Sequence, residues 1–173
     1  MRCVALVGNP KPESRTLTVA AAAAQAVIDA AGLTGGVEVV DLCGLARRLL
    51  LPEPSPAVED AIEQVTRADL VVVASPTFKA TYTGLLKVFL DRFPHRALAG
   101  TIALPVLVMG APQHALAVEV HLRPLLVELG ATVPTPGLAV LESQLGDLDA
   151  VLQPWAAQVA PALGILAAAA LAR

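Results

Sequence analysis

The chain has 173 residues, of which 55% are hydrophobic, 16% charged and 3% aromatic, and its formal net charge is −3. The apolar content excludes intrinsic disorder, and the length predicts a single domain over residues 1–173. Its longest basic run is Arg47-Arg48. The chain therefore lacks the basic tracts and stacking rings that hold nucleic acid or anionic membrane, and we expect neither as a partner.

Cysteines and histidines are too scattered for a metal or redox motif. Cys3 and Cys43 form no CxxC pair, and His95, His114 and His121 form no HExxH motif. We expect both cysteines to be reduced core residues, and we expect no metal site. The first residues lead directly into a strand-like run without the apolar segment of a signal peptide, so the expected location is cytoplasmic.

Short runs of Val, Leu and Ile alternate with helical stretches along the chain. This order is typical of βαβ units and predicts a parallel sheet with helices on both faces. The first run is hydrophobic without alternation, as expected for a strand covered on both sides. The predicted strands are residues 3–7, 37–42, 70–74, 102–109 and 137–141. The predicted helices are residues 16–31, 56–67, 84–93, 113–129 and 148 onward.

Prolines complicate two of these elements. Pro105 lies inside the fourth strand and removes one ladder donor, which by itself favours an edge strand or a bulge. Residues 150–172 carry no charge and meet the length criterion for a membrane span. However, this stretch consists mainly of alanine and is interrupted by Pro154 and Pro161. We therefore predict a buried or subunit-packing helix.

Three loops at the carboxyl ends of predicted strands have unusual compositions, and open α/β sheets bind ligands at this edge. In the first loop, residues 8–16, Ser14 or Thr16 can cap the following helix, whose free N–H groups favour an anion. Arg15 adds a planar fork of donors that suits phosphate. The loop is neither a Walker A nor a GxGxxG motif. A plain capped turn explains the same residues, so phosphate binding is one of two interpretations.

The other two loops offer surfaces for a flat ligand. Residues 75–84 combine small polar groups with Phe78 and Tyr82, against which a ring with polar edges would fit. The alternative is that both aromatic residues pack the loop itself. Residues 110–114 begin with a glycine, which permits close approach of a ligand. His114 is the titratable residue of that loop. It is either a solvated loop histidine or helix cap, or a catalytic base.

Several motifs follow one another through the chain in a fixed order. They are Gly8-Asn9-Pro10, Ser14-Arg15-Thr16, Ala74-Ser75-Pro76-Thr77-Phe78-Lys79-Ala80, Gly84-Leu85-Leu86-Lys87, Leu104-Pro105 before Gly110, Leu116-Ala117-Val118 and Leu122-Arg123-Pro124. Together they resemble the NADPH-dependent FMN reductases of the flavodoxin-like superfamily, especially the flavin reductases of two-component sulfonate monooxygenases. The resemblance spans most of the chain.

The resemblance implies an α/β fold, a flavodoxin-like three-layer sandwich whose five-stranded parallel sheet has the order 2-1-3-4-5 and helices on both faces. It places FMN across the ends of strands one, three and four, and it accounts for Pro105, since relatives carry proline in that strand. The implied phosphate loop consists of Gly8, Asn9, Pro10, Ser14, Arg15 and Thr16. The implied ring contacts are Pro76, Thr77, Phe78 and Lys79 on one side and Gly110, Ala111, Pro112, Gln113 and His114 on the other.

The implied activity is reduction of FMN by NADPH or NADH. Hydride passes from the nicotinamide to flavin N5, and the reduced flavin goes to a flavin-dependent monooxygenase partner. No catalytic side chain is expected, because the two cofactors carry the electronic work. This expectation agrees with a sequence in which no paired carboxylates or nucleophile triad are found.

Two other functions stay open. In the first, the protein retains FMN and reduces quinones, azo dyes or metal oxyanions; residues 119–121 read Glu-Val-His where relatives devoted to flavin reduction often carry an inserted aromatic. The second is a flavodoxin-type electron carrier, but a net charge of −3 is small for the acidic docking surface of such carriers. The apolar helices at residues 84–93 and 148–172 predict a homodimer or homotetramer.

Overall fold

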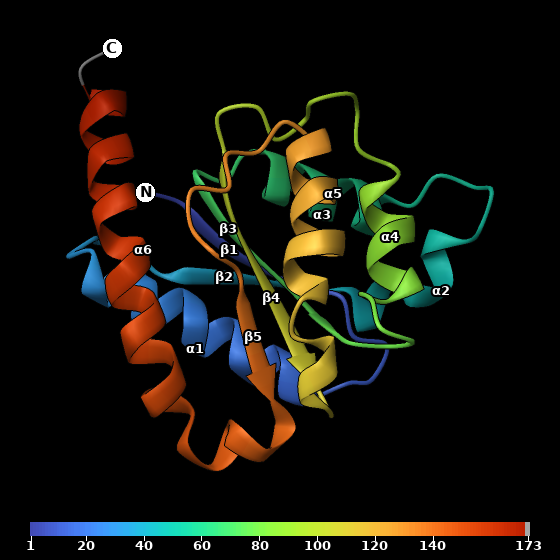
Figure 1. Cartoon of the computed structure of the whole chain (residues 1–173). Helices are drawn as coiled ribbons and strands as arrows, with labels where there is room; N and C mark the ends of the chain where they lie inside the picture. The colour runs from blue at the N-terminus through green and yellow to red at the C-terminus, as the bar shows by residue number, and fades with distance from the viewer. Residues whose placement is uncertain (172–173) are drawn as a thin grey trace.

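A parallel five-stranded sheet organises the molecule. The computed structural model describes the backbone of residues 1–171 and the side chains of residues 1–164. The strands lie in the order β2-β1-β3-β4-β5, and their carboxyl ends meet at one edge (Figure 1). They are β1 (Cys3–Val7), β2 (Val37–Asp41), β3 (Leu70–Pro76), β4 (Ile102–Met109) and β5 (Leu138–Leu141). The strand order predicted from the sequence is confirmed.

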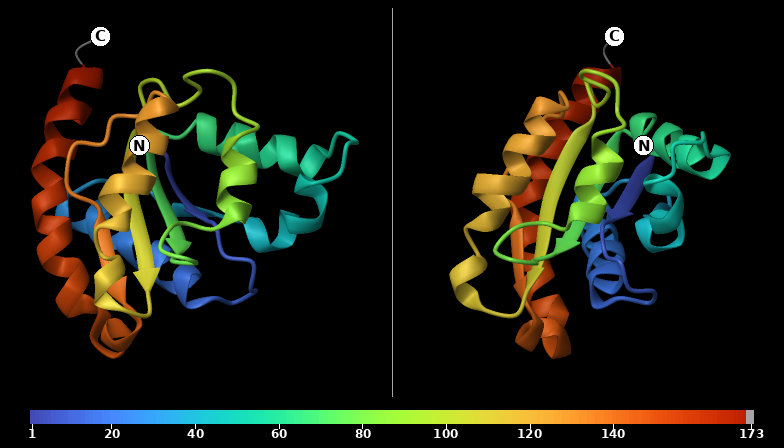
Figure 2. Two further views of the ribbon diagram at one scale, coloured as in Figure 1. Left: turned by 45° about the vertical axis from the view of Figure 1, so that its right-hand side comes forward. Right: turned by 90° about the vertical axis from the view of Figure 1, so that its right-hand side faces the viewer.

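Helices cover both faces of this sheet, and Figure 2 shows the layers from two further directions. One face carries α1 (Arg15–Ala30) and α6 (Leu148–Leu171). The other face carries α2 (Ala46–Leu49), α3 (Pro56–Thr66), α4 (Gly84–Leu90) and α5 (Arg123–Glu128). The βαβ pattern in the sequence therefore corresponds to a sheet that is buried on both sides.

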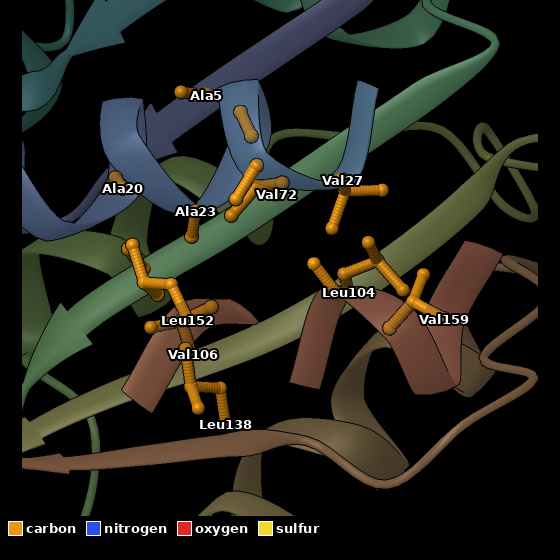
Figure 3. Packing of buried hydrophobic residues seen from close by; sticks show 14 of the residues in the cluster. Ala5, Ala20, Ala23, Val27, Val72, Leu104, Val106, Leu138, Leu152 and Val159 are labelled. Atoms are coloured by element: carbon orange, nitrogen blue, oxygen red, sulfur yellow. The ribbon is translucent and has the colours of Figure 1, made fainter. Parts of the chain in front are cut away.

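Alternate residues of the central strands contribute to two separate hydrophobic cores. On β1, Ala5 joins the core under α1 and α6, whereas Leu6 joins the core on the opposite face. Ala20 and Ala23 of α1 are fully buried in this core, and Ala23 lies beside Val72 of β3 (Figure 3). Because these alanines are small, α1 packs closely on the sheet, and every residue of β1, β3 and β4 is buried.

The backbone nitrogen of Pro105 faces a position beside β4 where no neighbouring strand needs an N–H donor. Ala103 donates its N–H to the carbonyl of Thr132, on the β5 side of β4. The backbone nitrogen of Pro105, two residues further on, faces the same side. Within the described chain, β5 starts to pair with β4 only at Leu138, opposite Val106. The strand therefore continues through a residue that cannot donate, without a bulge.

The helix predicted over residues 113–129 is wrong in its first half. A 3₁₀ turn and then a π-helical turn at Val118–Leu122 precede α5, which begins at Arg123. Pro124 has no N–H to donate to the carbonyl four residues earlier, so a regular α-helix cannot run through this point. The Arg123 guanidinium binds the carboxylate of Glu119, which fixes the wide turn.

Other differences from the predicted elements are short. The sequence pattern did not predict the 3₁₀ turns at Leu42–Leu45 and Glu142–Asp147 or the single helical turn of α2. β2 ends one residue earlier than predicted because the side chain of Asp41 accepts from the N–H of Cys43 and starts the turn. These turns lack the hydrophobic periodicity by which longer elements are recognised.

α6 packs along α1 at one side of the molecule (Figure 1). Leu152 and Trp155 lie on the buried face of α6. Pro154 and Pro161 lie on its exposed face, where water can hydrogen-bond to the carbonyls that lose an N–H partner. This agrees with the predicted buried helix as far as residue 164; the side chains of the remaining predicted residues, 165–172, lie outside those described. Among the described residues, no helix combines the length and hydropathy needed to cross a bilayer.

Candidate functional site

The loop after β1 is joined to the start of α4 through buried groups. Gly8 donates its N–H to the carbonyl of Ala74 at 2.8 Å, and its own carbonyl accepts from the Thr83 hydroxyl. A Cβ atom at position 8 would lie 2.6 Å from Leu86 Cβ, so only glycine fits here. Thr83 also caps α4 by accepting from the N–H of Leu86. The first two predicted loops therefore form one connected unit.

Asn9 sets the direction of a short hydrogen-bond chain. Its Oδ1 accepts from the N–H of Lys11 at 3.0 Å, so its amide nitrogen is the donor to Thr16 Oγ1 at 2.9 Å. Thr16 is only 1% exposed. Since the Thr16 oxygen already accepts the amide proton, its own proton is available for another acceptor. Asn9 thus leaves the buried Thr16 hydroxyl as a donor.

The N-terminus of α1 presents the kind of donors that an anion site requires. Ser14 caps the helix, and its side chain accepts from the N–H of Leu17 at 3.2 Å. No acidic residue lies in the first turn, so the positive end of the helix dipole is not neutralised by the helix itself. The cap leaves the Ser14 hydroxyl proton free to donate. The hydroxyls of Ser14 and Thr16 therefore flank the first backbone N–H groups of the helix.

The Arg15 guanidinium lies at the same helix end and is paired with a distant carboxylate. Arg15 Nη1 donates to Oε2 of Glu142 at 2.6 Å. Glu142 is the first residue of the turn that follows β5, so two strand ends contribute to the pair. The side chains are 64% and 50% exposed, respectively. Either partner of such an exposed ion pair can readily be replaced by another charged group, because the net stabilisation of the pair in water is small.

A hollow of about 240 Å³ joins these groups to the end of β3. Six of the residues predicted from the sequence line it: Asn9, Ser14, Arg15, Thr16, Pro76 and Phe78. Five lining residues were not predicted: Lys11, Pro12, Glu13, Val108 and Glu142. The hollow thus combines the helix N-terminus, two cations and a wall of apolar atoms from β3 and β4.

The loop after β3 makes a tight turn at the rim of this hollow. Phe78 and Thr81 exchange backbone hydrogen bonds, with N···O distances of 2.9 and 3.3 Å. The two residues between them, Lys79 and Ala80, have φ values of 53° and 65°. This left-handed backbone is typical of a type I′ turn, in which glycine or asparagine is preferred, so both residues are strained. The turn holds Phe78 with its side chain 46% exposed.

The remaining predicted residues lie around the hollow rather than in its wall. They are Gly8, Pro10, Thr77, Lys79, Gly110, Ala111, Pro112, Gln113 and His114. Thr77 donates its N–H to the carbonyl of Val108 at 2.8 Å, while its buried hydroxyl has no partner among the described protein groups. Residues 110–114 follow β4 at the same edge of the sheet and form a largely exposed 3₁₀ turn.

The groups with perturbed titration lie away from the hollow. Burial raises the pKa of the Cys3 thiol to about 11, which keeps this core residue protonated. Hydrogen bonds from Arg123 and from the N–H of Gly137 lower the pKa of Glu119. Cys43 is only half-buried, contrary to the expectation of a core residue, and its thiol lies 3.3 Å from the carbonyl of Pro10. Both cysteines are free thiols.

Comparison with known proteins identifies the chain. A family model described as NADPH-dependent FMN reductase matches residues 1–146. The chain belongs to this family. It is 36% identical over 149 residues to "FMN reductase (NADPH)" of Escherichia coli (strain K12), covering 85% of this chain and 76% of that protein. It is 30% identical over 167 residues to "NADH-dependent FMN reductase SfnF" of Pseudomonas fluorescens (strain Pf0-1), covering 92% and 86%.

Solved structures agree with membership of the FMN reductase family. The apo form of NADH:FMN oxidoreductase (EMOB) superposes with a TM-score of 0.82 at 30% identity and covers 93% of this chain and 89% of that one. A flavodoxin from the domain Archaea shares the fold, with a TM-score of 0.55 at 16% identity. The family, the flavodoxin-like fold and the function of an NAD(P)H-dependent FMN reductase predicted from the sequence are confirmed.

The donor groups of this FMN reductase suit a phosphate monoester. Helix N–H groups, the hydroxyls of Ser14 and Thr16 and the Arg15 guanidinium are all donors, and donors to an anion form stronger hydrogen bonds than neutral pairs. These residues fit FMN better than a ligand without charge. Thr77, directly after β3, does not line the hollow, and its buried hydroxyl has no partner among the described groups.

Sequence reasoning missed the acidic side of the hollow. Glu142 lies directly after β5, at the same carboxyl edge as the loops that were recognised. Its position after a strand end was the available signal, but no local motif marks it. Its pairing with Arg15 joins residues 127 positions apart. Only the strand order of the FMN reductase fold brings them together.

Proposed function

We propose that the protein reduces FMN with NADPH or NADH, releases the reduced flavin, and supplies it to a flavin-dependent monooxygenase. Family membership supports the reaction class. The resemblance of the loop motifs to flavin reductases of two-component sulfonate monooxygenases supports the partner. The observation that carries the proposal is the convergence of Ser14, Arg15 and Thr16 on one hollow beside Phe78.

In this proposal the first loop holds the FMN phosphate. The N–H groups that open α1 and the Ser14 and Thr16 hydroxyls donate to the phosphate oxygens, and Arg15 supplies the compensating charge. Gly8 and Asn9 have supporting roles, since they fix the loop backbone and the Thr16 proton. Pro10 follows them on the exposed side of the loop. This division of roles predicts that phosphate recognition and loop shape respond to different substitutions.

The flavin ring would lie over the turn that follows β3. Pro76 and Phe78 offer apolar surface in the wall of the hollow, and Thr77 and Lys79 would flank the ring from the same loop. Gly110, Ala111, Pro112, Gln113 and His114 would close the opposite edge. When bound together, the nicotinamide and the flavin supply the hydride-transfer chemistry themselves. The task of the protein is to orient the two rings and to stabilise negative charge with prearranged donors.

We infer further that FMN is a substrate that exchanges, rather than a retained group. The hollow is small, at about 240 Å³, and Arg15 and Phe78 are 64% and 46% exposed. Retained ligands are normally enclosed over most of their surface. Purified protein should therefore be colourless, and NADPH oxidation should depend saturably on added FMN without any partner reductase. A yellow protein that reduces quinones by ping-pong kinetics without added FMN would contradict this inference.

An oligomer remains part of the proposal, but α4, one of the two helices expected to form its interface, is largely buried. Leu86 and Phe89 of α4 are buried in the core of the subunit itself, so this helix offers little apolar surface. Exposed apolar side chains occur instead at Leu116, Val120 and Val127, which are 65%, 51% and 55% exposed. Their spacing places them along the segment that contains α5. Light scattering of the wild type and of Val120→Glu should give a dimer or tetramer and a smaller species, respectively.

A further inference from the structure

The side chain of Glu142 has no structural task in its own turn. The turn after β5 is held by Gln144, whose Oε1 accepts from the N–H of Leu141 at 2.8 Å. The Glu142 carboxylate instead reaches Arg15, at 2.6 Å, and lines the same hollow. Both side chains are at least half exposed. Their contact therefore concerns the hollow rather than the stability of the turn.

A carboxylate is an unexpected lining group for an anion site. The charged residues that line the hollow are Lys11, Glu13, Arg15 and Glu142, two cations and two anions. A site built to retain a phosphate dianion would carry excess positive charge. Here Arg15, whose planar guanidinium suits a phosphate, already binds a carboxylate of opposite charge. A bound phosphate has to share Arg15 with Glu142 or displace it.

We propose that Glu142 sets the affinity for phosphorylated flavin by competing with the phosphate for Arg15. The inference rests on the proposed phosphate loop and deepens it by naming the residue that keeps FMN exchangeable. The competition weakens binding without abolishing it, because an exposed ion pair is worth little and is easily exchanged. Glu142 acts on the phosphate end of the ligand only, so it affects FMN and leaves riboflavin, which has no phosphate, unaffected.

The test is the affinity of Glu142→Gln for FMN and for riboflavin, measured by quenching of flavin fluorescence without nicotinamide. We expect FMN to bind about three- to tenfold more tightly than to the wild type, since one negative charge near the dianion is removed, and riboflavin to be unchanged. High salt should reduce the gain, because the charges are exposed. Asp147→Asn is the matched control: it removes the same charge from the same turn but does not line the hollow. It should leave both affinities unchanged.

The Arg15→Ala background separates competition from simple repulsion. Glu142→Gln should have little effect there, because the contested guanidinium is gone. Unchanged or weaker FMN binding by Glu142→Gln, equal tightening of riboflavin, or a full gain in the Arg15→Ala background would each overturn the proposal. Failure of the phosphate loop itself looks different: the wild type would then bind FMN and riboflavin equally, whatever residue 142 is.

Discussion

Replacing Asn9 by aspartate should reverse the hydrogen-bond chain from Asn9 to Thr16 in the proposed phosphate loop. One carboxylate oxygen can still accept from the N–H of Lys11, as Asn9 does at 3.0 Å. The other oxygen, however, replaces a donor, so the Thr16 hydroxyl must turn its proton toward it. The phosphate then loses a donor, worth about 1.5–3 kcal/mol, and gains a nearby negative charge. We expect FMN affinity to fall by roughly 2–4 kcal/mol, about thirtyfold to several hundredfold.

Fluorescence quenching with FMN and riboflavin measures this effect. Asn9→Asp should lower the affinity for FMN far more than that for riboflavin, and Thr16→Val should do the same by deleting the donor directly. In the double variant the two losses should not add, since both remove the same proton. Thermal unfolding checks that the loop still folds. An equal loss of affinity for both flavins, or an unchanged FMN affinity in Asn9→Asp, would refute the donor role of the Asn9 amide toward Thr16.

Three further predictions concern other parts of the molecule. Arg15→Ala should weaken FMN binding by about 1–2 kcal/mol and spare riboflavin, while Arg67→Ala, at another exposed helix pair, should change neither. Ala80→Gly should raise the free energy of unfolding in urea by about 0.5–1 kcal/mol, because glycine relieves the φ of 65°; a loss of stability would contradict the strain. The lowered pKa of Glu119 stabilises the fold above the ordinary carboxyl pKa, and this stability is lost as pH falls through the lowered value. Urea unfolding at pH 7 and pH 4 should therefore show a smaller loss of stability in acid for Glu119→Gln than for the wild type.

Local signals were sufficient for most of the strands and helices, whereas the strand order came from the family resemblance. The uninterrupted hydrophobicity of residues 3–7 and 102–109 identified strands buried on both faces, and the structure buries all of them. Ser14 or Thr16 was expected to cap the first long helix because both stand before a helical run, and Ser14 is the residue that caps α1. Such features depend on residues a few positions apart, so sequence pattern carries them.

Features that depend on distant residues could not be read in this way. The partner of Arg15 is fixed by strand order, and the neutral effect of Pro105 depends on where β5 begins to pair. The left-handed backbone at Lys79 and Ala80 carries no glycine to indicate it. The start of α5 is decided by Pro124 together with a contact of the preceding arginine, and helical propensity alone predicts a longer helix.

The hydrogen-bonded connection between the first two loops limits the length of the ligand that the proposed site accepts. Thr83 donates to the carbonyl of Gly8 and caps α4 at the same time. Gly8 also packs tightly against Leu86, so the loop after β1 cannot shift relative to α4. The loop proposed to bind the phosphate and the turn proposed to carry the flavin ring are consequently held at a fixed distance from each other. A flavin whose ribityl chain is one carbon shorter or longer should bind no better than riboflavin, because only one end can be seated at a time.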